Sequence, residues 1–417
     1  MKYGCIGEKL GHSFSKEIHN RLADYPYELK ELRPEEIDSF MRNHDFCAIN
    51  VTIPYKQTVI PYLDSISPQA EAIGAVNTIV NRGGKLYGYN TDFFGMRALI
   101  LRAGIEVASK KVLILGSGGT SKTARAVAAD LKAREVLVVS RTGKDGITYE
   151  QAYADHTDAE IIINTTPCGM FPKIHAAPID LDRFSNAEGV IDAVYNPLRT
   201  ELILQAQERR IPAAGGLYML VAQAAFAVEF FLDTKVSSEK IESVFREIDR
   251  SKKNIVLSGM PGCGKSTVGR ILSSRLGMAF FDTDALITER AGKSPSELIT
   301  ERGEAAFRDL ESQVIAEQVA PMNGSVIATG GGAILRDENV RNLKKNGYIV
   351  FLDRPLDELA MSDDRPLSSN RTLLEQRYRE RYQRYCDTAD QIISPASVLE
   401  ENCKKIIEEM NHETACY

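Results

Sequence analysis

The sequence lacks the features of exported, membrane-spanning and disulfide-stabilised proteins. Its seven cysteines are scattered, odd in number and without a C-x-x-C pair, which argues against a disulfide framework or a zinc site and favours reduced thiols. Residues 1–20 hold no apolar run of signal-peptide length, and the most apolar stretch, 219–232, is short and contains Gln223 and Glu229. We therefore expect a cytoplasmic protein with no membrane span.

An excess of charge of one sign and low-complexity tracts are also missing. The net charge is only −6 and the signs are interspersed, so no basic face for a nucleic-acid backbone is expected. A composition with 43% hydrophobic and 26% charged residues is that of a globular protein. Because the chain has 417 residues, and a domain has roughly 100–200, we expect two or three domains that act on small molecules.

What the sequence does contain is two segments that each show a buried strand, a glycine-rich turn and a helix, at 111–131 and 254–276. This unit builds parallel sheets that bind ligands at the strand ends. Two such units far apart predict two nucleotide sites. Between them, 236–248 has the pattern of an amphipathic helix and 249–254 is a polar run, where we place a domain boundary.

The first glycine turn favours a dinucleotide. It begins after the apolar run 112–115 and contains Gly116, Ser117, Gly118 and Gly119. Glycines there allow backbone N–H groups to approach a pyrophosphate at the helix N-terminus. The next predicted strand, 136–139, is followed by Ser140, Arg141 and Thr142. An arginine at this position, where an NAD site carries an acidic residue, favours the 2′-phosphate of NADP.

The second glycine turn matches the complete G-x-x-x-x-G-K-S pattern of a phosphate-binding loop at 259–266. Its backbone N–H groups suit ATP phosphates, Lys265 can reach the outer phosphates and the Ser266 hydroxyl can bind Mg²⁺. We interpret Cys263, at a variable position of the loop, as a tolerated small residue. The predicted ATP-binding residues are Gly262, Cys263, Gly264, Lys265, Ser266 and Thr267.

Residues 1–249 resemble the shikimate dehydrogenase family. The motifs that carry the resemblance are GHSFSKEIHN, NVTIPYK, IGAVNT, GYNTD, GSGGTSK, SRT, NTTPCGM and GLYMLVAQAA, in the family's order. The resemblance implies that the substrate is bound by Ser13, Ser15, Thr52, Asn77, Tyr195 and Gln223. It implies that the cofactor also contacts Thr120, Thr166, Gly216 and Met219. His12 and His19 gain no role from it and are interpreted as structural.

Lys56 and Asp92 match the family's catalytic pair. When hydride reaches a ketone carbon, negative charge grows on the oxygen, and an ammonium group can stabilise that charge and supply the proton. A carboxylate beside the lysine raises the lysine pKa, whereas proton transfer near neutral pH favours a lowered one. The sequence therefore leaves open whether Lys56 is a proton donor or an electrostatic group.

Residues 254–417 resemble shikimate kinase, a P-loop kinase. The motifs are GMPGCGKSTVGR, FFDTDALI, GEAAFRDLE, ATGGGAI, DDRPL and RYQRYCDTAD. The resemblance implies Asp284 at the reacting hydroxyl, Asp282 with Ser266 at Mg²⁺, and Arg308 and Arg381 on the substrate carboxylate. It also implies that Gly330, Gly331 and Gly332 contact the ring and that Arg365 acts from a lid. The stretch 352–367 is shorter than in the family, which puts the lid's adenine contact in doubt.

Together these observations predict an α/β chain with two enzymatic parts. The first would reduce 3-dehydroshikimate with NADPH, and the second would phosphorylate shikimate with ATP and Mg²⁺. An NAD-dependent quinate or shikimate dehydrogenase, or a non-catalytic ligand sensor, are the alternatives, and the oligomeric state stays open. The expected parts are a substrate lobe at 1–105 with helices at 215–249, a Rossmann-like NADP lobe at 106–214, a linker at 250–253 and the P-loop kinase domain at 254–417.

Overall fold

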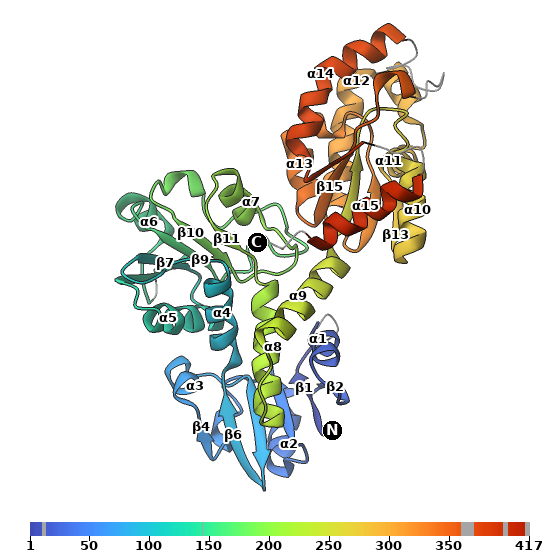
Figure 1. Ribbon diagram of the computed structural model, residues 1–417. Helices are drawn as coiled ribbons and strands as arrows, with labels where there is room; N and C mark the ends of the chain where they lie inside the picture. The colour runs from blue at the N-terminus through green and yellow to red at the C-terminus, as the bar shows by residue number, and fades with distance from the viewer. Residues whose placement is uncertain (11–13, 144, 360–370, 395–398, 413–417) are drawn as a thin grey trace. The chain divides into compact units, whose positions relative to one another are not determined.

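The protein is described by a computed structural model that covers residues 1–10, 14–143, 145–359, 371–394 and 399–412. The chain forms two compact units, which are described separately. Among the described residues, unit 1 contains Met1–Asn196 and Leu202–Ile248, and unit 2 contains Pro197–Glu201 and the residues from Asp249 to His412. Figure 1 colours the chain from the N-terminus to the C-terminus.

Unit 1 begins with a six-stranded sheet in the order β2-β1-β3-β5-β6-β4. Strands β1, β2 and β3 are parallel, and β5 runs antiparallel to β3 and β6. Gly83 and Gly84 join β5 to β6 at φ values of +61° and +87°, which suit a tight hairpin turn. The strands are β1 Tyr3–Gly7, β2 Tyr27–Glu31, β3 Ala48–Val51, β4 Ser65–Ile66, β5 Thr78–Arg82 and β6 Lys85–Tyr89.

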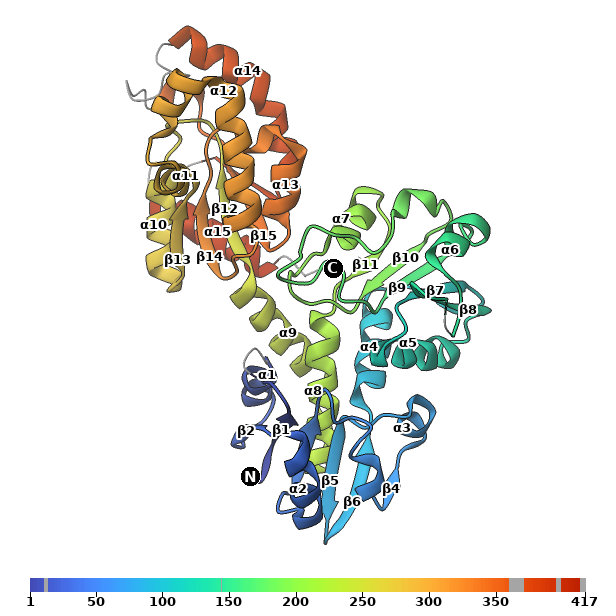
Figure 2. The same cartoon turned by 180° about the vertical axis from the view of Figure 1, so that it is seen from behind.

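Two long helices, α4 and α8, pack against each other beside this sheet (Figures 1 and 2). Helix α8 is apolar over most of its surface because it also contacts α1, β3 and β5. No helix of the described residues is both long and apolar enough to cross a lipid bilayer. The helices are α1 Ser15–Leu22, η1 Pro34–Glu36, α2 Ile37–Asn43, η2 Ile60–Tyr62, α3 Pro68–Ile73, α4 Thr91–Arg102, α8 Leu217–Leu232 and α9 Ser238–Lys252.

The second sheet of unit 1 is fully parallel, in the order β11-β10-β9-β7-β8. Since β7 pairs with β8 on one side and β9 on the other, the strand order reverses there, which is where such sheets bind ligands. The strands are β7 Lys111–Leu115, β8 Glu135–Val139, β9 Ile161–Asn164, β10 Gly189–Asp192 and β11 Ala213–Ala214. The helices are α5 Gly119–Asp130, α6 Tyr149–Asp155, η3 Leu181–Arg183 and α7 Glu201–Glu208.

Unit 2 is a five-stranded parallel sheet in the order β13-β14-β12-β15-β16, with helices on both faces (Figures 1 and 2). The strands are β12 Asn254–Ser258, β13 Ala279–Asp282, β14 Ser325–Ala328, β15 Gly347–Leu352 and β16 Gln391–Ile393. The helices are α10 Lys265–Leu276, α11 Thr283–Ala291, α12 Pro295–Val314, η4 Ile315–Val319, η5 Ala333–Leu335, α13 Asp337–Lys344, η6 Leu356–Glu358, α14 Arg371–Thr388 and α15 Leu399–His412.

The predicted α/β class, with a Rossmann-like sheet followed by a P-loop sheet, is confirmed, and most of the run predicted as a linker at 250–253 is helical. Helix α9 continues to Lys252 and β12 starts at Asn254. The side chains of Asp249 and Lys253 form an ion pair of 3.1 Å and are only 8% and 4% exposed. Because a buried charge needs a partner, these two paired residues belong to the packed structure, although the composition of the run is that of a connector.

His19 lies in an aromatic cluster of unit 1 and is 1% exposed. Its ring stacks on Tyr27 at 3.9 Å between centroids, and Nδ1 lies 2.7 Å from the hydroxyl of Tyr25. Burial lowers the pKa of His19 from 6.5 to about 3. The folded state therefore holds a neutral imidazole where the unfolded chain would bind a proton below pH 6.5.

This burial predicts acid sensitivity. The free energy of unfolding should fall as the pH drops from about 6.5 towards 3, because His19 binds a proton in the unfolded state but stays neutral in the folded state. His19→Phe should lower the thermal midpoint at pH 7.5 but reduce the further drop between pH 7 and 5. Tyr25→Phe removes the same hydrogen bond and keeps the imidazole, so it should retain the full drop. Equal drops in both variants would contradict this assignment.

Candidate active sites

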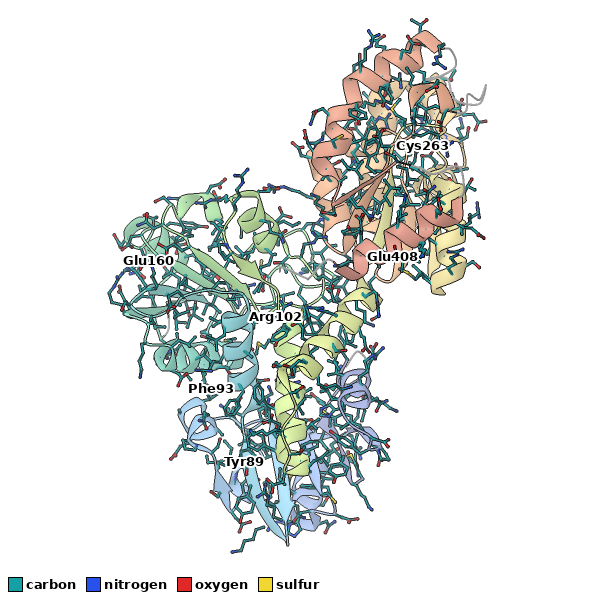
Figure 3. All side chains as sticks on the ribbon, viewed as in Figure 1. Tyr89, Phe93, Arg102, Glu160, Cys263 and Glu408 are labelled. Atoms are coloured by element: carbon teal, nitrogen blue, oxygen red, sulfur yellow. The ribbon has the colours of Figure 1, made fainter. Side chains whose placement is uncertain are left out.

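Lys56 and Asp92, distant in sequence, are brought together in unit 1. Lys56 follows β3, and its backbone carbonyl accepts a hydrogen bond of 2.8 Å from Val76 N. Asp92 lies in the first turn of α4, which Asn90 caps by accepting from Phe93 N; Figure 3 labels Phe93 on this helix. Lys56 Nζ donates to Asp92 Oδ2 at 2.6 Å, and the two side chains are 29% and 22% exposed. The pair is therefore partly shielded from water yet accessible to a ligand.

Asn77 and Gln223 are connected to this pair through α4. Asn77 Oδ1 accepts from the backbone N–H of Thr91 at 2.7 Å, and the Thr91 hydroxyl lies 3.3 Å from Gln223 Oε1. Gly95 allows α4 and α8 to approach, because a Cβ atom there would lie 2.7 Å from Met219 O and 2.9 Å from Gln223 Cβ. The close helix pair thus places Gln223 beside the turn that carries Asp92.

The remaining predicted substrate residues lie at the ends of other elements of unit 1. Thr52 is half-buried at the end of β3, and its N–H donates to Ile6 O at 3.0 Å. Ser15 begins α1. The preceding residue, Phe14, packs on Tyr195 with 5.5 Å between ring centroids, and burial raises the pKa of Tyr195. Ser13 lies outside the described residues.

The predicted dinucleotide loop lies between β7 and α5, at the reversal of strand order. Gly116 has a φ of +103°, and a Cβ atom there would lie 2.9 Å from Thr166 Cγ2, so the position requires glycine. Gly118 caps α5 without a side-chain hydrogen bond, and Gly119 and Thr120 form its first turn. Exposed N–H groups at this helix start suit a phosphate.

The other predicted cofactor residues follow β8 or begin α8, and their exposure differs. Ser140 is 6% exposed, and its hydroxyl has no partner among the described residues. Arg141 and Thr142 are exposed at the end of β8, beside the loop. Gly216 has no room for a side chain, because its Cβ atom would overlap Ala193 O. Met219 is buried on α8.

Two buried residues behind the cofactor loop were missed by sequence reasoning. Asn164 Oδ1 accepts from the N–H of Thr166 at 3.0 Å and from its hydroxyl at 2.7 Å. Asn164 Nδ2 in turn donates to Asp192 Oδ1 at 2.9 Å. Both side chains are 0% exposed. The asparagine of NTTPCGM therefore shapes the turn that carries Thr166.

The P-loop of unit 2 wraps around its own lysine. Gly259, Gly262 and Gly264 have φ values of +142°, +85° and +97°, which other residues rarely adopt. Lys265 Nζ donates to Gly259 O at 2.8 Å and to Met260 O at 3.1 Å. Cys263 is 1% exposed, and Figure 3 labels it within this unit. The ammonium group thus lies inside the curve of the loop.

The predicted Mg²⁺ ligands are adjacent. Ser266 Oγ donates to Asp282 Oδ2 at 2.7 Å, and Asp282 Oδ1 caps α11 by accepting from Asp284 N at 3.0 Å. Among the residues that the structure describes, no group of three or more His, Cys, Asp and Glu side chains is arranged to hold an ion. One hydroxyl and one carboxylate fit Mg²⁺, which commonly takes its other ligands from phosphates and water.

A charged cluster faces the glycines that follow β14. Arg308 forms ion pairs of 2.7 Å with Glu311 and 3.1 Å with Glu304. Glu311 is 0% exposed, burial raises its pKa, and its Oε1 has no hydrogen-bond partner among the described residues. Sequence reasoning missed Glu311. Its spacing of three residues from Arg308 on a helix indicates an ion pair, although not the burial of its carboxylate.

The glycine triplet 330–332 lets these charged groups approach the backbone. A Cβ atom on Gly330 would lie 2.7 Å from Glu311 Oε1 and 2.9 Å from Asp284 Oδ1, and one on Gly332 would overlap the Arg308 guanidinium. Arg381, 6% exposed, donates to Gly331 O at 3.3 Å. The loop thus gathers Asp284, Arg308 and Arg381. Arg365 lies outside the described residues.

Comparison with protein families gives two matches along the chain. The model described as shikimate dehydrogenase substrate binding domain matches residues 5–79. The model described as shikimate kinase matches residues 261–411. The first match includes Lys56 and Asn77, and the second includes the P-loop from Pro261 onward and the cluster around Arg308.

Individual relatives match the first part of the chain. Shikimate dehydrogenase (NADP(+)) from Clostridium perfringens is 34% identical over 59% of this chain and 97% of its own length. The crystal structure of shikimate dehydrogenase 1 from Peptoclostridium difficile is 36% identical, covers 60% of this chain and 98% of its own, and has a TM-score of 0.54. A chorismate mutase/shikimate 5-dehydrogenase fusion protein from Clostridium acetobutylicum is 33% identical over 59% and 96%, with a TM-score of 0.56. The chain therefore belongs to the shikimate dehydrogenase family and carries a shikimate kinase domain after it.

Proposed function

We propose that the chain is a bifunctional enzyme. Unit 1 reduces 3-dehydroshikimate to shikimate with NADPH, and unit 2 transfers a phosphoryl group from ATP to shikimate, giving shikimate 3-phosphate. The observation that carries the proposal is the order of the matches, because a near-full-length dehydrogenase relative is followed by a shikimate kinase domain. The product of the first reaction is then the substrate of the second.

In unit 1, Lys56 and Asp92 support ketone reduction. NADPH, when bound, supplies the hydride. The Lys56 ammonium, held 2.6 Å from Asp92 Oδ2, stabilises the negative charge on the substrate oxygen and delivers a proton to it. Asn77, Gln223 and Thr52 orient the ring hydroxyls, and Ser13 and Ser15 bind the carboxylate. The carboxylate of Asp92 orients Lys56 and accepts from a ring hydroxyl.

In unit 2, the arrangement suits phosphoryl transfer, which requires positioning and neutralisation of charge. ATP supplies the phosphoryl group, and Ser266 and Asp282 would hold Mg²⁺, which would offset phosphate charge. When ATP binds, the Lys265 ammonium group would exchange its hydrogen bonds to the loop carbonyls for contacts with the outer phosphates. Asp284 accepts the proton of the reacting hydroxyl. Arg308 and Arg381 bind the substrate carboxylate, a geometry that a planar guanidinium fits.

We also propose a cytoplasmic location. The cysteines of the described residues, at positions 5, 47, 168, 263, 386 and 403, are all free thiols. Free thiols in this number suit a reducing compartment, where disulfides are rare. Small molecules are the proposed partners, and the interspersed charge that gives a net value of −6 offers no face for nucleic acid.

Arg141 tests the proposed choice of NADP over NAD. Arg141→Asp should lower the ratio of kcat/KM for NADPH to that for NADH by about 10- to 100-fold, since a charge-assisted hydrogen bond is worth about 1.5–3 kcal/mol. Arg134→Asp, at the opposite end of β8, should leave the ratio unchanged. A wild-type enzyme that already prefers NADH would contradict the assignment of Arg141.

A single mixture tests the whole proposal. The protein is combined with 3-dehydroshikimate, NADPH, ATP and Mg²⁺, and NADPH loss is followed together with ADP and shikimate 3-phosphate. We expect both cofactors to be consumed, with shikimate 3-phosphate forming after a lag. Consumption of NADPH alone would refute the kinase assignment. Binding of shikimate without any turnover would identify the chain as a ligand sensor.

A further inference from the structure

A buried hydrogen-bond network lies behind the proposed ring-hydroxyl contacts of unit 1. Thr91 is 0% exposed and touches two of them, since its backbone N–H and hydroxyl lie 2.7 and 3.2 Å from Asn77 Oδ1, and the hydroxyl lies 3.3 Å from Gln223 Oε1. Thr78, also 0% exposed, donates to Asn77 Oδ1 at 3.1 Å. Thr78 is the first residue of β5, and Thr91 is the first residue of α4, directly before Asp92.

The direction of each bond follows from two backbone groups that have only one possible role. The Thr91 N–H can only donate, so the atom of Asn77 that faces it is the oxygen. The Asn77 carbonyl can only accept, so the atom of Asn50 that lies 3.3 Å away is the nitrogen. Asn50 Oδ1 then accepts from the Tyr27 hydroxyl at 2.7 Å.

The same reasoning assigns the hydroxyl protons. Asn50 Nδ2 donates to Thr78 Oγ1 at 3.1 Å, so the Thr78 proton points to another acceptor, and Asn77 Oδ1 at 3.1 Å is nearer than Thr91 Oγ1 at 3.3 Å. Together with the Thr91 N–H, this fills both lone pairs of Asn77 Oδ1. The Thr91 hydroxyl proton is therefore left for Gln223 Oε1. Both side-chain amides are held through their oxygens, and Gln223 Nε2 donates one of its two N–H groups to Leu220 O at 3.0 Å.

We propose that Thr91, with Thr78, Asn50 and Tyr27 behind it, is a positioning residue. Its backbone N–H fixes the side-chain oxygen of Asn77, and its hydroxyl holds the side-chain oxygen of Gln223, whose nitrogen is held by Leu220 O. Asn77 and Gln223 then present only N–H donors to the ligand, so the site selects substrates whose ring groups accept hydrogen bonds at those two points. This inference rests on the proposed dehydrogenase function and deepens it. A merely structural threonine would affect stability without altering discrimination between ligands.

The test uses isosteric changes in the full chain. Thr91→Val removes the hydroxyl and keeps the shape and the backbone N–H, whereas Thr91→Ser keeps the hydroxyl. We expect Thr91→Val to raise the KM for 3-dehydroshikimate and the Kd for shikimate about tenfold, the equivalent of roughly 1.4 kcal/mol for the Gln223 amide that has lost the hydrogen bond to its oxygen. The KM for NADPH and the kinase rate should not change, and Thr91→Ser should recover most of the affinity.

A ligand series separates orientation from stability. The Kd values of shikimate and of analogues that each lack one ring hydroxyl are measured with wild type and Thr91→Val. In wild type, deleting the hydroxyl that faces the amides should weaken binding strongly, and in Thr91→Val the same deletion should cost several-fold less. If Thr91→Val fails to fold, Tyr27→Phe, at the far end of the network, should show the same loss of discrimination in weaker form.

The outcomes separate the inference from the function on which it rests. Equal losses of affinity for every analogue in wild type and variants, or an unchanged KM in Thr91→Val and Tyr27→Phe, would overturn the positioning role while leaving the dehydrogenase function intact. A wild-type protein that neither reduces 3-dehydroshikimate nor binds shikimate would overturn the proposed function, and the inference with it.

Discussion

Replacing Lys56 with alanine should lower the turnover of 3-dehydroshikimate reduction by about 10²- to 10⁴-fold, the usual contribution of one general acid. The physical reason is the position of the ammonium group, 2.6 Å from Asp92 Oδ2 and partly shielded from water. Without it, the growing negative charge on the substrate oxygen has no adjacent cation and no proton source. The rate of ATP-dependent phosphorylation should be unchanged.

Lys56→Arg distinguishes the two roles that the sequence left open. Arginine keeps the positive charge but does not release a proton, because its pKa is above about 12. Substantial activity in Lys56→Arg would assign an electrostatic role, and activity as low as that of Lys56→Ala would assign proton donation. Lys85→Met, an exposed lysine on β6, is the control. Near-normal turnover of Lys56→Ala would refute the assignment of the pair.

Lys265→Ala should abolish ADP and shikimate 3-phosphate formation and leave NADPH oxidation intact. Lys265 is the ammonium group of the P-loop, held by Gly259 O and Met260 O, and its loss removes positive charge from the transferred phosphoryl group. Removing one preorganised electrostatic contact typically costs at least about 10²-fold in rate. Initial rates of the two reactions, measured separately with saturating substrates, give the result.

Lys404→Ala, an exposed lysine on α15, is the matched control and should retain both activities. Circular dichroism establishes that Lys265→Ala is folded. Loss of NADPH oxidation in a folded Lys265→Ala variant would show that the two reactions depend on each other. Retention of phosphorylation would remove Lys265 from the proposed kinase site.

The residues that sequence reasoning identified share one property: each lies where the backbone conformation or the reaction permits only one or two residue types. Gly116, Gly262 and Gly264 occupy positive φ values, and such positions are readable as glycine-rich turns between a strand and a helix. Lys56 and Asp92 were paired by resemblance to a family, and the structure places them in contact. Their catalytic roles remain predictions.

The residues that were missed act through partners that no local pattern reveals. Asn164 and Asp192 end neighbouring strands, β9 and β10, and their contact depends on the pairing of those strands. Glu311 resembles an ordinary helix-surface residue in the sequence, but the glycine loop after β14 covers it completely. The run 249–253 has the composition of a linker, and the burial of Asp249 and Lys253 within it depends on their ion pair.

Gly95 has a consequence for how freely this site can be remodelled. The absence of a side chain there sets the spacing of α4 and α8, since a single methyl group would meet Met219 O and Gln223 Cβ at 2.7 and 2.9 Å. The lack of a side chain at Gly95 therefore fixes the distance between the helix that carries Asp92 and the helix that carries Gln223. To enlarge the substrate range by separating these helices, both packed helix surfaces would have to be redesigned together. Substitutions at Thr52 or Tyr195, which follow the ends of strands, are therefore the simpler route to a new specificity.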